Sequence, residues 1–458
     1  MRFFCGSLCQ GRLVSVTRCQ HRKLGDLAQK IEQNTGVSEP IPFRREPFIQ
    51  PQKEPRQDPY LLVAPELTRL RSNLLDLLGS TQPGLTDIAN YYFLQPSKQL
   101  RSLLVLLLSR ATNGSGTHWD RKHWEALCER EFGHSERLDR PLTRPDVLHE
   151  WNPSMPDTTS SFESVFQLQR TSPRSDAPIP PSSSRSTTPC IVSPPILLPT
   201  QIRLAQIVEM IHIASTLHDG VVTEMDGKVD SAAAHGFANK LAILGGDFLL
   251  GRASTALSQL RESEVVELIA SVISNLVEGE ILSMGNVQTP ELGAGAGPKT
   301  PAAAWDLYLK KTYLKTASLM AKGARAAVIL GGCRESGILK EVAYAYGRNL
   351  GIAYQILEDT LDYEKGPSNV RLGLATGPAL YAWEENPEIQ PLIQRNFSND
   401  GDVERAIDIV RGTSGIERTR ILAQSYADRA RKALHFLPDS DTKMALDTLT
   451  RIVIERTC

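Results

Sequence analysis

The sequence lacks several features that mark whole classes of protein. No apolar run approaches the roughly 18 residues of a membrane-spanning helix, since the purest one, Leu103 to Leu108, is far too short. Lys and Arg (51) balance Asp and Glu (52), so there is no basic excess for wrapping a nucleic acid. The seven cysteines form no CxxC pair, which argues against a zinc ribbon or a disulfide framework and suits a reducing compartment. These absences, with 41% hydrophobic and 22% charged residues, predict a soluble globular protein without a transmembrane segment or a nucleic-acid partner.

The N-terminus has an unusual composition. Residues 1–25 carry five basic side chains with Ser and Thr between them, and no acidic residue precedes Asp26. This composition is typical of a mitochondrial transit peptide, and the alternative is a disordered tail that happens to be basic. We expect residues 1–25 to direct the protein to the mitochondrial matrix.

The remaining chain divides into four segments. Residues 26–59 contain six prolines, which exclude a long helix and predict a Pro-rich arm. Residues 60–151 show apolar residues at helical spacing. In the stretch 171–200, 19 of 30 positions are Pro, Ser or Thr, too polar a composition to form a core, so we predict a disordered insertion over 152–199. Helical periodicity then continues over 200–458.

Three glycine-containing sites interrupt this second helical stretch. We expect helix breaks at Gly245-Gly246, Gly331-Gly332 and Asp400-Gly401. No strict alternation of period two persists, as a strand would require. The sequence therefore predicts an all-α helical bundle interrupted once by the insertion.

The strongest chemical signal is Glu358-Asp359-Thr360-Leu361-Asp362, which follows an apolar run with helical character. On a helix, Glu358 and Asp362 lie on one face about 6 Å apart, with Asp359 beside them. Clustered carboxylates repel one another unless a cation neutralises them, and hard oxygens of this kind suit Mg²⁺ shared with substrate phosphates. The alternative is a solvated acidic face of a helix.

A second acidic group, Asp219 with Asp226, ends the amphipathic run that starts at Ile202. These carboxylates lie two helical turns apart, roughly 10 Å, which is too far to chelate one ion directly. Thr223 occupies the position between them, so this cluster is incomplete.

Taken together, these motifs resemble those of the trans-polyprenyl diphosphate synthases, most closely the mitochondrial type that makes the ubiquinone side chain. That family carries two aspartate-rich DDxxD helices that face one another across an all-α bundle. Glu358 to Asp362 resembles the second motif, and the segment from Asp219 to Thr223 stands in place of the first. The resemblance covers about residues 58–130 and 200–456, and its other characteristic segments are Met210 to His218, Asn239 to Gly251, Asn275 to Glu280 and Tyr313 to Ala317.

The resemblance implies a role for individual residues. Lys98 and Arg101 match the clamp for isopentenyl diphosphate, and Lys228 stands in the basic pair that follows the first motif. The metal ligands for Mg²⁺ would be Asp219, Glu358, Asp359 and Asp362. The allylic prenyl diphosphate and its developing cation would meet Lys315, Thr316 and Gln355, which with Asp219 and Asp359 form the implied catalytic set. Small residues at Ala214 and Ser215, one turn before Asp219, imply an open tunnel for a long product.

Several positions depart from the family pattern. Gly220 and Thr223 replace two aspartates of the first motif, Val229 replaces an arginine, and the segment after Lys365 is shortened. Three functions therefore remain open. The first is head-to-tail condensation of isopentenyl diphosphate with an allylic diphosphate by a homodimer. The second is a catalytically impaired subunit that stabilises or regulates an intact synthase in a heteromer. The third is a class I terpene cyclase, which would not need Lys98 and Arg101.

Overall fold

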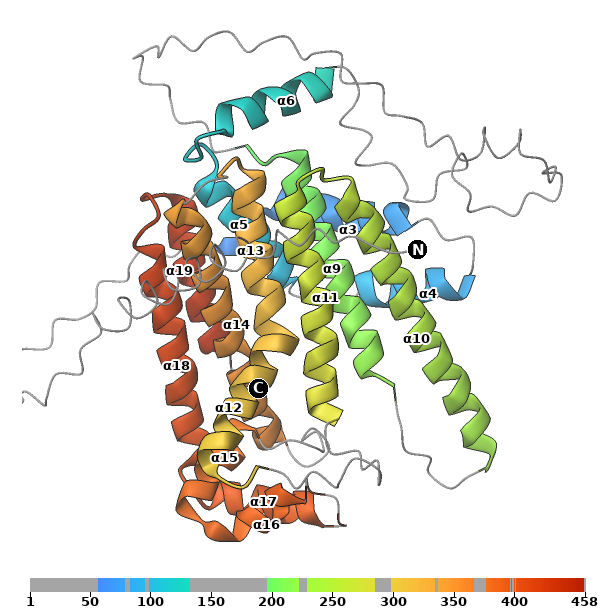
Figure 1. Ribbon diagram of the computed structural model, residues 1–458, viewed down its shortest axis with the longest axis vertical. Coiled ribbons are helices and arrows are strands. Elements are labelled where there is room, and N and C mark those ends of the chain that lie inside the picture. Colours follow the sequence, from blue (N-terminus) through green and yellow to red (C-terminus); the bar gives the residue numbers. More distant parts are fainter. Residues whose placement is uncertain are drawn as a thin grey trace, which may run out of the picture. The chain divides into compact units, whose positions relative to one another are not determined.

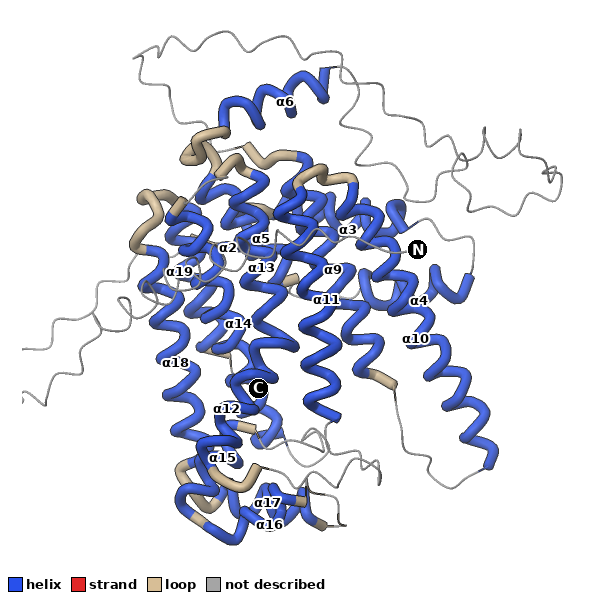
Figure 2. Tube along the Cα trace, viewed as in Figure 1, coloured by secondary structure: helices blue, strands red, loops and turns tan. Residues whose placement is uncertain are grey.

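The computed structural model is helical wherever it is described, with only turns and short connections between the helices (Figures 1 and 2). The all-α prediction is confirmed, and no described helix is both long and apolar enough to cross a membrane. The predicted transit peptide, nearly all of the Pro-rich arm and most of the insertion lie outside the described residues. The described ranges are 57–78, 83–94, 99–131, 196–221, 229–284, 298–333, 337–365, 376–395, 397, 399 and 401–456.

The helices fall on the two sides of the predicted insertion. Those before it are α2 (Pro59–Leu62), α3 (Ala64–Leu78), α4 (Pro83–Leu94), α5 (Leu100–Thr112) and α6 (Trp119–Glu131). Those after it are α9 (Pro199–Asp219), α10 (Val229–Ser258), α11 (Ser263–Met284), α12 (Pro301–Thr312), η2 (Tyr313–Ala317), α13 (Ser318–Leu330), α14 (Ile338–Lys365), α15 (Gly377–Glu385), η4 (Pro387–Ile389), α16 (Gln390–Gln394), α17 (Asp402–Arg411), α18 (Gly415–Leu434) and α19 (Asp441–Ile454). The described chain starts again at residue 196, and Leu197 and Leu198, just before the predicted boundary at residue 200, are buried.

Two apolar clusters hold the bundle together. The larger one surrounds α5, where Leu103 to Leu108 are at most 1% exposed, and includes residues of α9, α11, α13 and the first half of α14. This segment is apolar on all its faces and is accordingly buried on all of them. The smaller cluster joins the second half of α14 to α12, α15, α16 and α17, around Tyr308, Ile356 and Leu380. The helix α14 therefore belongs to both clusters, and its second half carries the acidic motif.

Two of the three predicted helix breaks are confirmed. Gly331 caps the end of α13 and Gly332 has φ 94°, while Gly401 precedes α17 with φ 82°. The break at Gly245-Gly246 is wrong, because both glycines lie inside α10. They are needed for packing instead, since a Cβ atom on Gly246 would lie 2.5 Å from Cδ2 of His218 on α9.

This contact gives a prediction for stability. Replacing a glycine inside a helix with alanine ordinarily stabilises the helix by about 1 kcal/mol. Gly246→Ala should instead destabilise the protein by about 1–3 kcal/mol, because the new methyl group meets the His218 ring. Urea unfolding measures the difference. Gly251→Ala on the same helix is the matched control, since its Cβ would meet nothing within 4 Å and should be stabilising. Equal effects of the two substitutions would contradict this packing role for Gly246.

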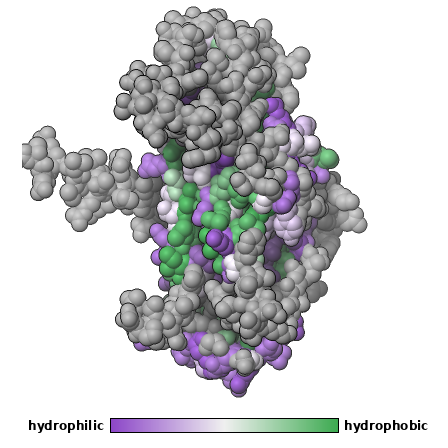
Figure 3. All heavy atoms as spheres, turned by 90° about the vertical axis from the view of Figure 1, so that its right-hand side faces the viewer, coloured by the Kyte–Doolittle hydropathy of each residue, from purple (hydrophilic) through white to green (hydrophobic). Residues whose placement is uncertain are grey.

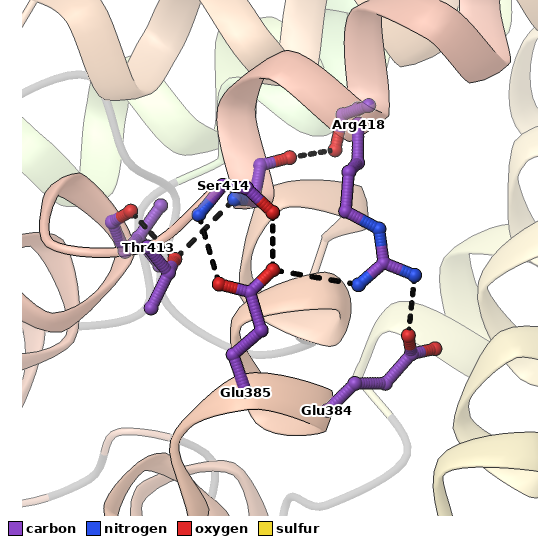
Figure 4. Close-up of polar contacts among 8 residues, drawn as sticks. Glu384, Glu385, Thr413, Ser414 and Arg418 are labelled. Carbon is purple, nitrogen blue, oxygen red and sulfur yellow. Dashed lines mark hydrogen bonds and ion pairs between the residues drawn. The ribbon is translucent and has the colours of Figure 1, made fainter.

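A polar clamp joins α15 to the start of α18 at the edge of the smaller cluster (Figure 4). The Glu385 carboxylate accepts hydrogen bonds from the backbone N–H of Ser414, at 3.0 Å, and from its hydroxyl. Arg418 pairs with Glu384 at 2.6 Å and lies over the Tyr381 ring, 4.2 Å from its centroid. Ser414 makes no capping bond with its own side chain, so Glu385 supplies an acceptor for the exposed amides at the start of α18.

Candidate active site

The first cluster of charged side chains in the site comes from three elements, η2, α9 and α11. Lys315 of η2 donates a hydrogen bond of 3.2 Å to Asp219 at the end of α9, and it also forms an ion pair with Glu280 of α11. Burial, and then the nearby Glu280, raise the pKa of Asp219, while Lys315 lowers it. Lys315 therefore acts as the shared counter-ion of two carboxylates. The sequence motifs predicted roles for Asp219 and Lys315 but not for Glu280.

Lys315 and Thr316 lie in a π-helical turn rather than in a regular α-helix. Such turns are rare and are frequent at functional sites. Two glycines allow neighbouring helices to approach it closely. A Cβ atom on Gly279 of α11 would lie 2.7 Å from Cγ of Lys315, and one on Gly351 of α14 would lie 2.7 Å from Cα of Ala317. Both glycines are therefore needed to position the lysine and the threonine, a function that their sequence context did not indicate.

A chain of hydrogen bonds crosses from η2 to the acidic motif. Thr316 donates to Oε1 of Gln355 at 2.7 Å, and Nε2 of Gln355 donates to Asp359 at 2.9 Å. The other oxygen of Asp359 accepts from the Tyr308 hydroxyl at 2.7 Å. These bonds determine the orientation of the Gln355 amide, because its oxygen and nitrogen each have a fixed partner. Asp359 is only 9% exposed, and burial raises its pKa.

The carboxylates of the second motif have different surroundings. Asp359 is held by Tyr308 and Gln355, whereas Glu358 forms an ion pair of 2.6 Å with Arg456, just beyond the end of α19. Asp362 lies one turn after Glu358 and is half-buried. Glu358 and Asp359 thus meet different partners, because adjacent residues on a helix point about 100° apart.

A second cationic side chain of the site, after Lys315, is Arg101 at the start of α5. Arg101 lies close enough to Glu209, Tyr354 and Glu358 for electrostatic interaction. Glu209 is buried and accepts a hydrogen bond of 2.9 Å from Ser102; burial raises its pKa and Arg101 opposes this. Gln99, which precedes the helix, is buried with φ 38°, a strained backbone conformation of the kind that clusters at functional sites.

His212 of α9 belongs to the same region. Burial, and then Arg101, hold the pKa of its imidazole well below the usual value, so the ring is neutral at physiological pH. Of the other predicted residues, Ala214 is fully buried and Ser215 is half-buried on the same helix. Lys98 and Lys228 lie outside the described residues, as does Thr223.

The comparisons with known proteins agree with this arrangement. A model of the polyprenyl synthetase family matches residues 192–410. The chain is 40% identical over 418 residues to a protein of Yarrowia lipolytica named as a probable mitochondrial hexaprenyl pyrophosphate synthase, covering 88% of this chain and 85% of the relative. It is 34% identical over 404 residues to subunit 1 of the decaprenyl-diphosphate synthase of Schizosaccharomyces pombe, covering 86% and 90% of the two chains.

The chain belongs to the polyprenyl synthetase family. The resemblance predicted from the motifs is therefore confirmed, and with it the enzyme class, a trans-prenyltransferase. The fold is similar to that of a polyprenyl synthase from Caulobacter crescentus, solved in complex with calcium and isoprenyl diphosphate. The TM-score is 0.57 at 22% identity, over 87% of this chain and 97% of that one.

The donor set of this polyprenyl synthetase suits a hard divalent cation. Its carboxylates meet cationic side chains, with the Lys315 ammonium between Asp219 and Glu280 and the Arg456 guanidinium on Glu358. Within the described part of the chain, no three His, Cys, Asp or Glu side chains converge to hold a metal by themselves. Mg²⁺ typically takes only one or two carboxylates and completes its coordination with water and substrate phosphates, so a sparse set of ligands fits its chemistry.

Proposed function

We propose that this protein condenses isopentenyl diphosphate head to tail with an allylic prenyl diphosphate, and that its long polyprenyl product serves as a ubiquinone side chain in the mitochondrial matrix. The observation that carries the proposal is the fixed series Thr316, Gln355 and Asp359 beside Lys315. Lys315, the cation that meets Asp219 at the end of α9, adjoins Thr316, which holds the oriented amide, and ionisation of an allylic diphosphate requires charge and donors of this kind. The names of the relatives support the product class and the compartment.

Each region of the site has a separate task in this reaction. Arg101, with Lys98, binds the diphosphate of the incoming isopentenyl group, since a guanidinium matches diphosphate oxygens with two parallel hydrogen bonds. Neutral His212 supplies an N–H donor without adding charge. On the other side, Lys315 and Thr316 bind the allylic diphosphate, and the oxygen of Gln355 faces the developing carbocation. Asp219 on α9, and Glu358 with Asp362 on α14, would each supply one or two carboxylates to Mg²⁺ shared with the diphosphate, and the metal would neutralise the charge of this leaving group.

A direct assay distinguishes the synthase from a non-catalytic subunit. Purified protein is incubated with Mg²⁺, farnesyl or geranylgeranyl diphosphate and labelled isopentenyl diphosphate, alone and mixed with an intact synthase. We expect labelled polyprenyl diphosphate from the protein alone. Activity that appears only as an increase in the partner's rate would identify a regulatory subunit instead. A cyclic hydrocarbon made without isopentenyl diphosphate would identify a terpene cyclase.

The same assay can compare the wild type with a variant in which the first motif is restored. Gly220→Asp, Thr223→Asp and Val229→Arg together restore the family pattern. If these departures limit the wild type, the triple variant should turn over faster. An inactive wild type with an equally inactive triple variant would shift the cause to another part of the chain, such as the shortened segment after Lys365.

Product length gives a prediction for Ala214. Its side chain is fully buried one helical turn before Asp219, and its small size leaves room for a growing chain. Ala214→Phe should shorten the products without abolishing the first condensation, because the added ring lies away from the reacting atoms. Chromatography of the dephosphorylated products measures the change. Unchanged chain lengths at a lower yield, or an unfolded protein, would show that Ala214 only allows helices to pack.

The proposed assembly is a homodimer formed through α10 and α11. Figure 3 shows apolar side chains gathered on the side of the molecule where α10 lies. Four large apolar residues of these helices are 44–62% exposed, namely Ile243, Leu244, Val277 and Ile281. Exposed apolar patches of this kind mark protein interfaces, and a two-fold axis lets the same patch of two copies pack together. In light scattering, the wild type should have the mass of a dimer and Leu244→Lys should have a smaller mass. A wild-type protein that is monomeric by itself and pairs only with another synthase would favour the heteromer.

A further inference from the structure

The last described residue of the chain lies against the acidic motif. Arg456 follows the end of α19 and forms an ion pair of 2.6 Å with Oε1 of Glu358, while its guanidinium lies over the Tyr354 ring, 5.0 Å from the centroid. Tyr60 of α2 is near enough to the guanidinium for electrostatic interaction. Both side chains of the ion pair are about one-quarter exposed. A residue almost 100 positions away in sequence therefore occupies one carboxylate of the predicted metal site.

The alignment of this ion pair is imperfect. Oε1 of Glu358 is buried and lies 2.6 Å from the Arg456 guanidinium, but the N–H direction departs from that of a well-aligned hydrogen bond. A buried carboxylate oxygen without an aligned donor retains an unsatisfied capacity to accept. It is therefore a favourable position for a second cationic ligand, and a divalent cation would exceed the guanidinium in charge.

The neighbours of Arg456 would allow its guanidinium to move away from Glu358 to a second position. Arg101 lies close to both Tyr354 and Glu358, the same two residues that hold Arg456. Arg456 lies beyond the last helical residue, Ile454, so the helix does not fix its side-chain direction. A guanidinium released from Glu358 would still have the Tyr354 ring beneath it, and Arg101 interacts with the same tyrosine.

We propose that Arg456 and a divalent cation compete for Glu358, and that the arginine displaced by the metal becomes an additional contact of the isopentenyl diphosphate. This rests on the proposed function, since it takes Glu358 as a metal ligand and Arg101 as a diphosphate contact. The exchange couples the two halves of the site, because metal loading at one makes a cation available to the other. Glutamate is one methylene longer than the aspartate of the family motif, which extends its reach toward Arg456.

Two binding measurements without turnover test the exchange. Electron paramagnetic resonance counts free Mn²⁺ in the presence of the protein, and calorimetry measures the binding of isopentenyl diphosphate alone, with and without Mg²⁺. Arg456→Gln should tighten Mn²⁺ binding about 3–10-fold, because the competing cation is gone, and should weaken binding of isopentenyl diphosphate about 10-fold in Mg²⁺. Glu358→Gln should do the reverse: it weakens Mn²⁺ binding and strengthens binding of isopentenyl diphosphate in the absence of metal.

The matched control is Arg451→Gln, one helical turn earlier, where the arginine pairs with Asp447 at 3.0 Å and should leave both affinities unchanged. Opposite changes in the two affinities support the exchange, since loss of structure would weaken both. Equal weakening of both in Arg456→Gln, or no change in either, would overturn it while leaving the proposed function intact. A wild-type protein that binds neither Mn²⁺ nor isopentenyl diphosphate would overturn the proposed function and the exchange together.

Discussion

Turnover should fall by roughly 10²–10³ when Lys315 is replaced with methionine, the range found when one preorganised electrostatic contact with developing charge is lost. Lys315 is the cation nearest to Asp219 and Glu280, and the proposed mechanism uses it to bind the departing diphosphate. Methionine retains most of the length of the side chain and removes its charge. The rate with labelled isopentenyl diphosphate measures the loss.

A second measurement separates lost chemistry from lost structure. Asp219 and Glu280 lose the ammonium that they share in this variant, and one positive charge that competes with a metal is removed, so Mn²⁺ binding in the absence of substrate should be retained or become tighter. Because Lys315 lowers the pKa of Asp219, this pKa should also rise further in the variant. Lys310→Met, an exposed position on α12, is the control and should keep full activity. A variant that loses Mn²⁺ binding together with turnover would contradict the counter-ion role.

Asp359→Asn should reduce turnover about 100-fold by reversing the amide of Gln355. The carboxylate now accepts from both Tyr308 and Gln355, whereas an asparagine side chain can accept on one side only. If its oxygen keeps the Tyr308 bond, its amide faces the amide of Gln355, and Gln355 must rotate so that its nitrogen points at Thr316. The oxygen proposed to face the carbocation then changes place.

Two controls accompany this substitution. Asp306→Asn lies on the same helix as Tyr308 and is exposed, so it should leave activity unchanged. Asp359→Ala removes the acceptor of the buried Tyr308 hydroxyl, which should cost about 1–3 kcal/mol in the free energy of unfolding, and it also removes that of the half-buried Gln355 amide. Thermal unfolding and turnover should therefore separate the variants: asparagine affects mainly the rate, and alanine affects both. Full activity in Asp359→Asn would contradict the role of the amide orientation.

Much of the fold could be predicted because it depends on local pattern. The apolar run at Leu103 to Leu108 is buried as its composition requires, Gly331 caps the end of α13, and Gly401 precedes the start of α17. The rule that glycines interrupt helices also predicts a break at Gly245-Gly246, but these glycines are present because two helices pack closely there. The space that a side chain would fill is occupied by His218 from another helix, and no property of the local sequence reports that.

The site shows a similar division. The family motifs predicted roles for Lys315, Thr316 and Gln355, and the structure brings these three residues together. The relation between Glu358 and Arg456 could not be predicted from spacing, because it joins the second motif to the end of the chain. Glu280 could not be given a role for the same reason: its partner Lys315 comes from a separate element, and the segment Asn275 to Glu280 also contains Glu278, so the sequence does not show which glutamate meets the lysine.

The π-helical turn rotates one half of the continuous helical segment from Pro301 to Leu330 relative to the other half. A π-turn holds one residue more than an α-helical turn does, so side chains before and after it are rotated by about 100° relative to an uninterrupted helix. This rotation lets one continuous segment serve two cores, with Tyr308 in the smaller cluster and Ala324 and Val328 in the larger. Deleting a single residue between Tyr313 and Ala317 would restore a regular helix, but it would turn one half of the segment away from its core. The extra residue of this turn therefore sets the rotation of one half of the segment relative to the other. If it were lost, small changes beside the turn could not return both halves to their apolar clusters.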